Sequence, residues 1–349
     1  MSLASDEILI SSDSHVMEDP ELWVNGVSAA LKEQAPKFPP RVLGEGFQAQ
    51  PGGWDPAERV KEMAKDGVSA EVLYPTLGLS LFGLDDPKMQ EACFRVYNDW
   101  IIDYCSAAPD RLWGIGCISV YNIDHAIEEL ERCKRNGLRG SLVWQAPHPD
   151  LPFTSDHYER FWAASQELDM PVNFHILTGH NYSKNGFGGG GIEHYRGSVN
   201  LKMFDAVNLF FDLIFYGVLE RYPGLKVVNV ENEIGWIPFV LQQWDYYYRR
   251  YYDTNRPPIE MAPSEYFRRQ IYVTFFDDAV GGHNFAWWGE DNCMWSNDYP
   301  HPNSTWPRSR EVIERDLGHL TPELRKKLVC DNVAQVFGLK VPPLLELAR

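Results

Sequence analysis

Four apolar runs of the sequence contain or end in acids or histidines, the side chains that bind divalent metals in proteins. In chain order these residues are Asp13 and His15, then His175, Glu231 and Asp298. Asp13 and His15 are two positions apart, so on a β-strand their side chains point to the same side. This mixture of carboxylate and imidazole suits Zn²⁺, with Mn²⁺ or Fe²⁺ as alternatives. A metal held by a few protein ligands keeps a position for water or substrate.

The elements that would position these residues are strand-like runs alternating with amphipathic segments. Their near-continuous hydrophobicity is typical of strands covered on both faces, which indicates a parallel sheet. Repetition about eight times without a composition break predicts an α/β fold, a (β/α)₈ TIM barrel formed by one domain over residues 1–349. The runs are residues 8–15, 69–77, 112–120, 139–147, 170–178, 225–233, 270–276 and 292–300.

A doubly wound open sheet is the alternative fold. Its first turn should carry a glycine-rich phosphate loop, and the sequence SSDSHV has no glycine. The sequence marks where helices begin and end. A helix is expected over residues 55–67, with Asp55 as its N-cap, Pro56 at its first position and Gly67 at its end. Another helix is expected over residues 321–338.

A parallel barrel brings the carboxyl ends of its strands to one face, so the acids and histidines above should converge. Each of them alone has an ordinary structural explanation: Asp13 could cap a turn, and Asp298 could be an Asx-turn residue. Four strands that deliver metal-ligand side chains at matching ends favour one metal ion per chain. His180 and His301 lie on the loops after the fifth and eighth strands, where acid–base or supporting roles are open to them.

Composition restricts the partners. The net charge of −17 disfavours nucleic acid and anionic membranes, which attract basic surfaces. No secretory signal and no run long enough for a membrane helix is visible, and the six cysteines form no CxxC pair. We therefore expect a cytoplasmic protein with reduced thiols. The glycine-rich run GFGGGG (186–191) predicts an inserted loop after the fifth strand, either a lid over the site or a flexible surface loop.

Several segments resemble the amidohydrolase-related family that includes aminocarboxymuconate-semialdehyde decarboxylase and γ-resorcylate decarboxylase. The segments are SSDSHVMEDPELW, MPVNFHILTG, VENEIGWIPFVLQQWD, SNDYPHPNSTWP and DNVAQVFGL, in the family's order. The resemblance implies a (β/α)₈ barrel with one catalytic metal, usually Zn²⁺ and sometimes Mn²⁺, in a homodimer or higher homo-oligomer. It places the metal ligands on Asp13, His15, His175 and Asp298, with Asp298 also carrying a proton.

Two departures from the family pattern stand out. Asp13 stands where the muconate decarboxylase has histidine, and Glu231 stands near the position of that enzyme's catalytic histidine. No lysine ends the fourth strand, in the sequence LVWQAP, so a carbamylated lysine bridging two metals is not expected.

The resemblance favours a nonoxidative decarboxylase of a carboxylated aromatic or unsaturated cyclic acid, acting on a small-molecule substrate. The same centre could serve a hydrolase of an amide, lactone or C–C bond, or a hydratase, and a catalytically silent barrel is the third possibility. The proposed catalytic residues are Asp298, Glu231 and His180. An aromatic wall and a carboxylate partner for the substrate are expected from Trp54, Tyr74, Trp144, Tyr182, Phe276 and Arg196. The aromatic segment 239–253 is a candidate surface for oligomerisation.

Overall fold

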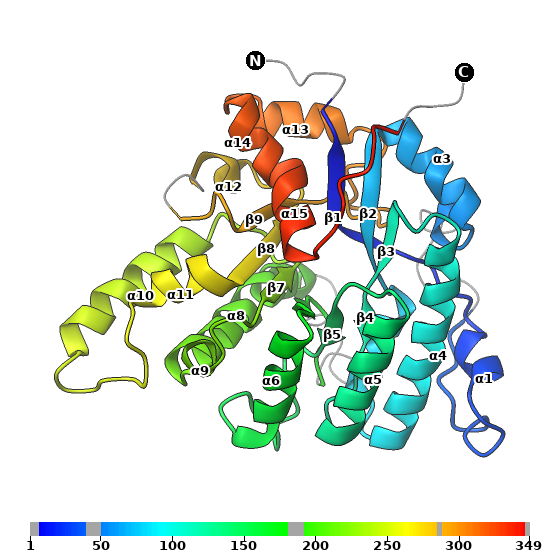
Figure 1. Cartoon of the computed structure of the whole chain (residues 1–349), viewed down its shortest axis with the longest axis horizontal. Helices are drawn as coiled ribbons and strands as arrows, with labels where there is room; N and C mark the ends of the chain where they lie inside the picture. The colour runs from blue at the N-terminus through cyan, green and yellow to red at the C-terminus, as the bar shows by residue number, and fades with distance from the viewer. Residues whose placement is uncertain (1–6, 40–49, 181–191, 285–287, 346–349) are drawn as a thin grey trace.

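The computed structural model describes residues 7–39, 50–180, 192–284 and 288–345. Its centre is a barrel of parallel strands with helices around it (Figure 1). Each of the eight predicted runs contains a strand, and residues 112–120 contain two, so the predicted (β/α)₈ barrel is confirmed. The strands are β1 (Leu9–His15), β2 (Val68–Tyr74), β3 (Leu112–Gly114), β4 (Gly116–Cys117), β5 (Ser141–Val143), β6 (Val172–His175), β7 (Val227–Val230), β8 (Ile271–Phe275) and β9 (Cys293–Trp295).

The strands pair in chain order, in one ladder of β1-β2-β3 and a second of β4 to β9. The two ladders meet at Ile115, between β3 and β4. The N–H of Ile115 donates to the Leu73 carbonyl, whereas the N–H of Gly116 donates to the Gly140 carbonyl. One stretch of chain therefore passes from one ladder to the other and acts as the third strand of the barrel.

Side chains and single backbone bonds, without a regular ladder, close the barrel between β1 and β9. The hydroxyls of Ser11 and Ser14 both donate to Asn297 Oδ1, at 3.1 and 2.8 Å. Ser12 Oγ donates to the carbonyls of Met294 and Trp295, at 3.2 and 2.9 Å. These serines are fully buried, so their hydroxyls need such partners. The serines around Asp13 therefore form the seam of the barrel.

Helices and short 3₁₀ turns follow the strands and cover the barrel. They are α1 (Leu22–Gly26), η1 (Pro51–Gly53), α3 (Pro56–Asp66), η2 (Leu77–Gly83), α4 (Pro87–Ser106), α5 (Ile123–Arg135), η3 (Asp156–Tyr158), α6 (Glu159–Glu167), α8 (Glu193–Phe215), α9 (Val218–Arg221), α10 (Ile237–Tyr251), α11 (Pro263–Gln270), α12 (Ala279–Asn284), α13 (Ser309–Leu317), α14 (Pro322–Lys326), the π-helical turn η5 (Lys327–Asp331) and α15 (Asn332–Val336).

The predicted helix ends agree with the structure. Asp55 Oδ1 accepts from the N–H groups of Ala57 and Glu58, and Gly67 ends α3 in the left-handed conformation. The helix predicted over residues 321–338 begins with Thr321 as its N-cap, but η5 interrupts it and divides it into α14 and α15.

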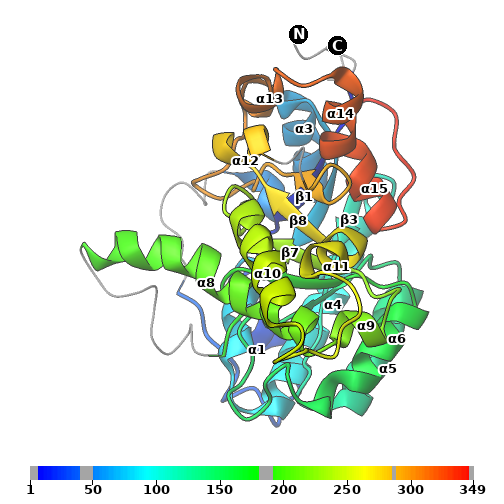
Figure 2. The same cartoon turned by 90° about the vertical axis from the view of Figure 1, so that its left-hand side faces the viewer.

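Helix α8 is the element that departs most from the barrel outline. Its N-terminal part extends away from the strands (Figure 2), and it exposes Tyr195, Val199 and Phe204 to solvent. The glycine-rich run 186–191 lies outside the described residues. Within the described ranges, no helix combines the length and apolar character that crossing a bilayer requires.

Candidate metal centre

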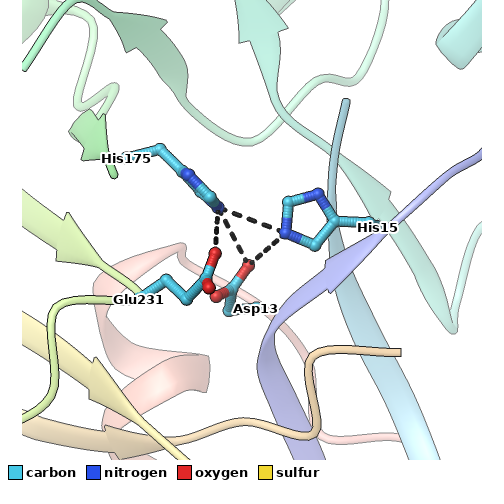
Figure 3. A group of neighbouring side chains, drawn as sticks. All are labelled: Asp13, His15, His175 and Glu231. Atoms are coloured by element: carbon cyan, nitrogen blue, oxygen red, sulfur yellow. Dashed lines mark hydrogen bonds and ion pairs between the residues drawn. The ribbon is translucent and has the colours of Figure 1, made fainter. Parts of the chain in front are cut away.

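Four side chains from three strand ends point toward one another at the mouth of the barrel (Figure 3). Asp13 and His15 belong to β1, His175 ends β6, and Glu231 follows β7. The Nε2 atoms of His15 and His175 lie 3.2 Å apart. Asp13 Oδ1 is 3.4 Å from the first and 3.7 Å from the second, and Glu231 Oε2 is 3.6 Å from His175 Nε2. These spacings place four potential ligand atoms around one point.

A second, overlapping group adds the side chains that follow β9. Asp298 Oδ1 lies 3.6 Å from His15 Nε2 and 2.9 Å from His301 Nδ1. His301 also stacks on His15, with the ring centroids 3.9 Å apart, and its Nε2 is 3.2 Å from the Thr76 hydroxyl. Asp298 and Glu231, which follow β9 and β7, therefore reach the same centre.

Backbone carbonyls set the orientation of the two central histidines. His15 Nδ1 lies 2.7 Å from the Pro75 carbonyl oxygen, and His175 Nδ1 lies 2.6 Å from that of Ile176. A carbonyl only accepts hydrogen bonds, so each Nδ1 carries a hydrogen and each Nε2 can present its lone pair inward. This arrangement of a second hydrogen bond on the outer nitrogen is the usual support for a metal-binding histidine.

The carboxylates of the centre accept few hydrogen bonds. Both oxygens of Asp13 are buried and accept no hydrogen bond from the described part of the chain, and the same is true of the two Asp298 oxygens. Burying a carboxylate without a partner is costly, and metal coordination is one of the few ways to offset that cost. The donor set fits one divalent cation.

Left-handed backbone turns two of the acids into the centre. Glu231 has φ 60° and Asp298 has φ 54°, a region that non-glycine residues rarely adopt and that clusters at functional sites. The N–H of Glu231 donates to Thr274 Oγ1, and the N–H of Asp298 donates to the Asp13 carbonyl. The second bond ties two candidate ligands together across the seam.

Arg59 on α3 fixes the backbone beneath the centre. Its Nη1 donates to the His15 carbonyl at 2.6 Å, and its Nε pairs with Glu71 on β2 at 2.5 Å. Both side chains are buried. Helix α3 therefore holds the end of β1 through a buried arginine whose charge is paired.

The electrostatics of the centre reflect acids crowded in a buried space. Burial raises the pKa of Asp298 to about 7 against the opposing effect of His15. Burial, and then the charge of Asp298, hold the pKa of Glu231 well above its usual range. Burial alone would lower the pKa of His175, but contact with Asp13 outweighs it and raises that pKa to about 9. A bound cation would favour the ionised acids.

The remaining predicted residues are distributed around the barrel. His180 is buried away from the four-residue group; its Nε2 is 2.5 Å from Asp85 Oδ1, and its ring lies 4.1 Å from that of His148. Tyr74 is fully buried, and its hydroxyl donates to Asn173 while its ring packs 5.5 Å from His175.

The other candidates for the substrate wall lie at different depths. Trp144 is buried, and its indole N–H donates to the Tyr158 hydroxyl. These contacts place it in the core packing. Trp54 is half exposed, and Arg196 is exposed on α8. Tyr182 lies outside the described residues.

One charged residue at the mouth, Lys202, was not predicted to have a role there. Lys202 on α8 pairs with Glu233, with Nζ and Oε1 3.1 Å apart, and its charge also acts on Glu231 and Asp298. Glu233 had a visible signal, because it follows the same strand as Glu231. Lys202 had none, because a lysine within a long helix is ordinary.

Comparison with known sequences assigns the family. A model of the Amidohydrolase family matches residues 12–339. This chain belongs to the amidohydrolase family, and it is an enzyme. A curated relative is the γ-resorcylate decarboxylase of Polaromonas sp. (strain JS666 / ATCC BAA-500), 24% identical over 304 residues, covering 80% of this chain and 86% of that protein.

Solved structures agree on the fold. An amidohydrolase from Mycobacterium avium subsp. paratuberculosis K-10 superimposes with a TM-score of 0.78 at 17% identity, over 95% of this chain and 100% of that one. The 5-carboxyvanillate decarboxylase of Novosphingobium aromaticivorans DSM 12444, complexed with manganese and 4-hydroxy-3-methoxy-5-nitrobenzoic acid, gives 0.73 at 19% identity, over 97% and 100% of the two chains.

Proposed function

We propose that this enzyme is a metal-dependent nonoxidative decarboxylase of a carboxylated aromatic acid. The observation that carries the proposal is the convergence of Asp13, His15, His175 and Asp298 at the mouth of the barrel, where the buried carboxylates face histidine nitrogens and accept no hydrogen bond from the described residues. The decarboxylases among its relatives supply the reaction class, because a fold alone does not fix a reaction.

The proposed ligands are these four residues, and Glu231 is close enough to His175 to join them. A divalent cation held there would supply Lewis-acid binding of substrate oxygens. The manganese in the related decarboxylase favours Mn²⁺ over the Zn²⁺ expected from the sequence. Six free and buried cysteines fit the reducing cytoplasm that the sequence predicted.

The role proposed for the chain's own residues is to deliver one proton to the substrate. When the bond to the carboxylate carbon breaks, its electron pair stays on the ring carbon, which must then receive a proton. Asp298 lies beside His15 and Glu231 beside His175, and these two acids are the proposed donors. Placing a donor beside the bound ring makes the protonation a positioned step within one complex. His180 is left with a supporting role through Asp85.

Hydrolysis or hydration at the same centre is the second candidate. The observation that favours it is Glu231 itself, because a carboxylate at the position of a catalytic histidine can accept a proton from water. The two reactions differ in the origin of the oxygen in their products.

The experiment uses Mn²⁺-loaded enzyme in ¹⁸O-labelled water with γ-resorcylate, 5-carboxyvanillate, and a set of lactones and amides. Release of CO₂ with no ¹⁸O in the aromatic product supports the decarboxylase, and ¹⁸O in the organic product supports the hydrolase. Asp298→Asn should abolish turnover, whereas the matched control Asp150→Asn, with a 90% exposed side chain, should retain it. Near-normal turnover by Asp298→Asn would defeat the role given to that residue.

A further inference from the structure

Lys202 is a cation held at the mouth of the barrel. Its Nζ lies 3.1 Å from Glu233 Oε1 and 4.9 Å from the centroid of the Phe276 ring. The side chain is 27% exposed, so the ammonium lies between bulk solvent and the buried centre. The ammonium is therefore accessible to a small ligand from solvent.

The strand ends hold Lys202 in place through Glu233. Glu233 has left-handed backbone, with φ 58°, and its Oε2 accepts from the N–H of Phe276 at 3.4 Å. The neighbouring Asn232 is buried and donates to Gln145 Oε1 at 2.9 Å, which fixes the turn after β7 against β5. One hydrogen bond to the Glu233 carboxylate and one from its neighbour Asn232 therefore anchor the residue that orients the ammonium.

The charge of the ammonium acts on the acids of the centre as well as on Glu233. Its positive charge lowers the pKa of both Glu231 and Asp298 against the larger effect of burial. An ammonium has three hydrogen-bond donors, and one carboxylate contact does not saturate them. Lysine in this role is a compact point charge that can serve two anions at once.

We propose that Lys202 binds the carboxylate of the substrate and makes the enzyme select aromatic acids over their neutral counterparts. This inference rests on the proposed function for the substrate class, and it adds the residue that recognises the acid. Its rival is a purely structural ion pair, in which Lys202 neutralises Glu233 and takes no part in ligand choice. The two differ in whether loss of Lys202 affects acids alone.

The test compares two pairs of probes that differ only by a carboxylate: 2,6-dihydroxybenzoate with resorcinol, and salicylate with phenol. Dissociation constants are measured by calorimetry on Mn²⁺-loaded enzyme, for wild type, Lys202→Met and Lys202→Arg, and a probe that the enzyme turns over is compared by its KM instead. The matched control is Lys226→Met, since Lys226 precedes β7 at the other end of the barrel and pairs with Asp169. Melting temperatures and metal content verify that each variant is folded and loaded.

We expect wild type to prefer the acid of each pair. Lys202→Met should weaken acid binding at least tenfold and change resorcinol or phenol binding less than twofold, and Lys202→Arg should recover part of the preference. Equal losses for acids and neutral probes, no loss at all, or a wild type without acid preference would each overturn the inference. If acid preference depends on Lys202 but no substrate yields CO₂, the proposed reaction fails and this inference stands.

Discussion

The substitution Asp298→Asn should stabilise the metal-free protein and destabilise the metal-bound protein, each relative to wild type in the same state. In the metal-free protein, burial raises the pKa of this carboxyl from 3.8 to about 7. An acid with a raised folded-state pKa contributes stability that is full below the unfolded pKa and is lost as pH rises through the folded pKa. Metal-free wild type should therefore lose stability between about pH 4 and pH 7.

The size of the effect follows from the same shift. At pH 8 the ionised Asp298 costs the metal-free folded state on the order of 2–4 kcal/mol, because each pKa unit corresponds to about 1.4 kcal/mol and the nearby histidines share the charge. Asparagine is neutral and removes this cost. At about 2 °C per kcal/mol for a chain of this length, metal-free Asp298→Asn should melt roughly 4–8 °C above metal-free wild type.

Metal should reverse this order. A cation at a thousand times its dissociation constant for wild type stabilises the folded state by about 4.1 kcal/mol, which exceeds the cost of the ionised Asp298, and the variant lacks one ligand. The assay is thermal unfolding at pH 5 and pH 8, with chelator and with Mn²⁺, using Asp150→Asn as a control that should follow wild type. The reasoning is refuted if chelated Asp298→Asn melts below chelated wild type at pH 8, or if Mn²⁺ stabilises both proteins equally.

Three further expectations concern the support of the centre and the outer surface. His15→Ala should reduce bound metal to well below one ion per chain by elemental analysis, and unchanged content would remove His15 from the ligand set. Arg59→Met should destabilise the fold by about 3–5 kcal/mol in denaturant titrations, because it leaves Glu71 buried without its partner; a loss under 1 kcal/mol would contradict this. Tyr247 is exposed on the aromatic face of α10, so Tyr247→Glu should convert an oligomer to smaller species in light scattering; a monomeric wild type would rule out this interface.

Much of the barrel could be predicted because its signals are local. Each strand is an apolar run with its polar residues at one end, and parallel pairing sends those ends to the same face. The grouping of Asp13, His15 and His175 followed from that rule. Glu231 was assigned to catalysis from the sequence, and the structure also brings it within reach of the ligand atoms.

The parts that could not be predicted depend on how outer elements are placed. Lys202 reaches the mouth because α8 is a long helix set at a particular position, and its helical spacing does not encode that position. His180 follows the same strand as His175, yet its loop turns it toward Asp85. The π-helical turn η5 within residues 321–338 also could not be predicted, because the hydrophobic pattern there does not differ from that of a continuous α-helix.

The seam between β1 and β9 has a consequence for how the enzyme is made. Asp13 and His15 on β1 and Asp298 after β9 jointly form the proposed cation site, with the N–H of Asp298 bonded to the carbonyl of Asp13. A ribosome releases Asp13 and His15 long before Asp298 is synthesised. The nascent chain therefore lacks the complete set of proposed ligands during most of translation, and metal can bind to the full set only after β9 and Asp298 have been synthesised.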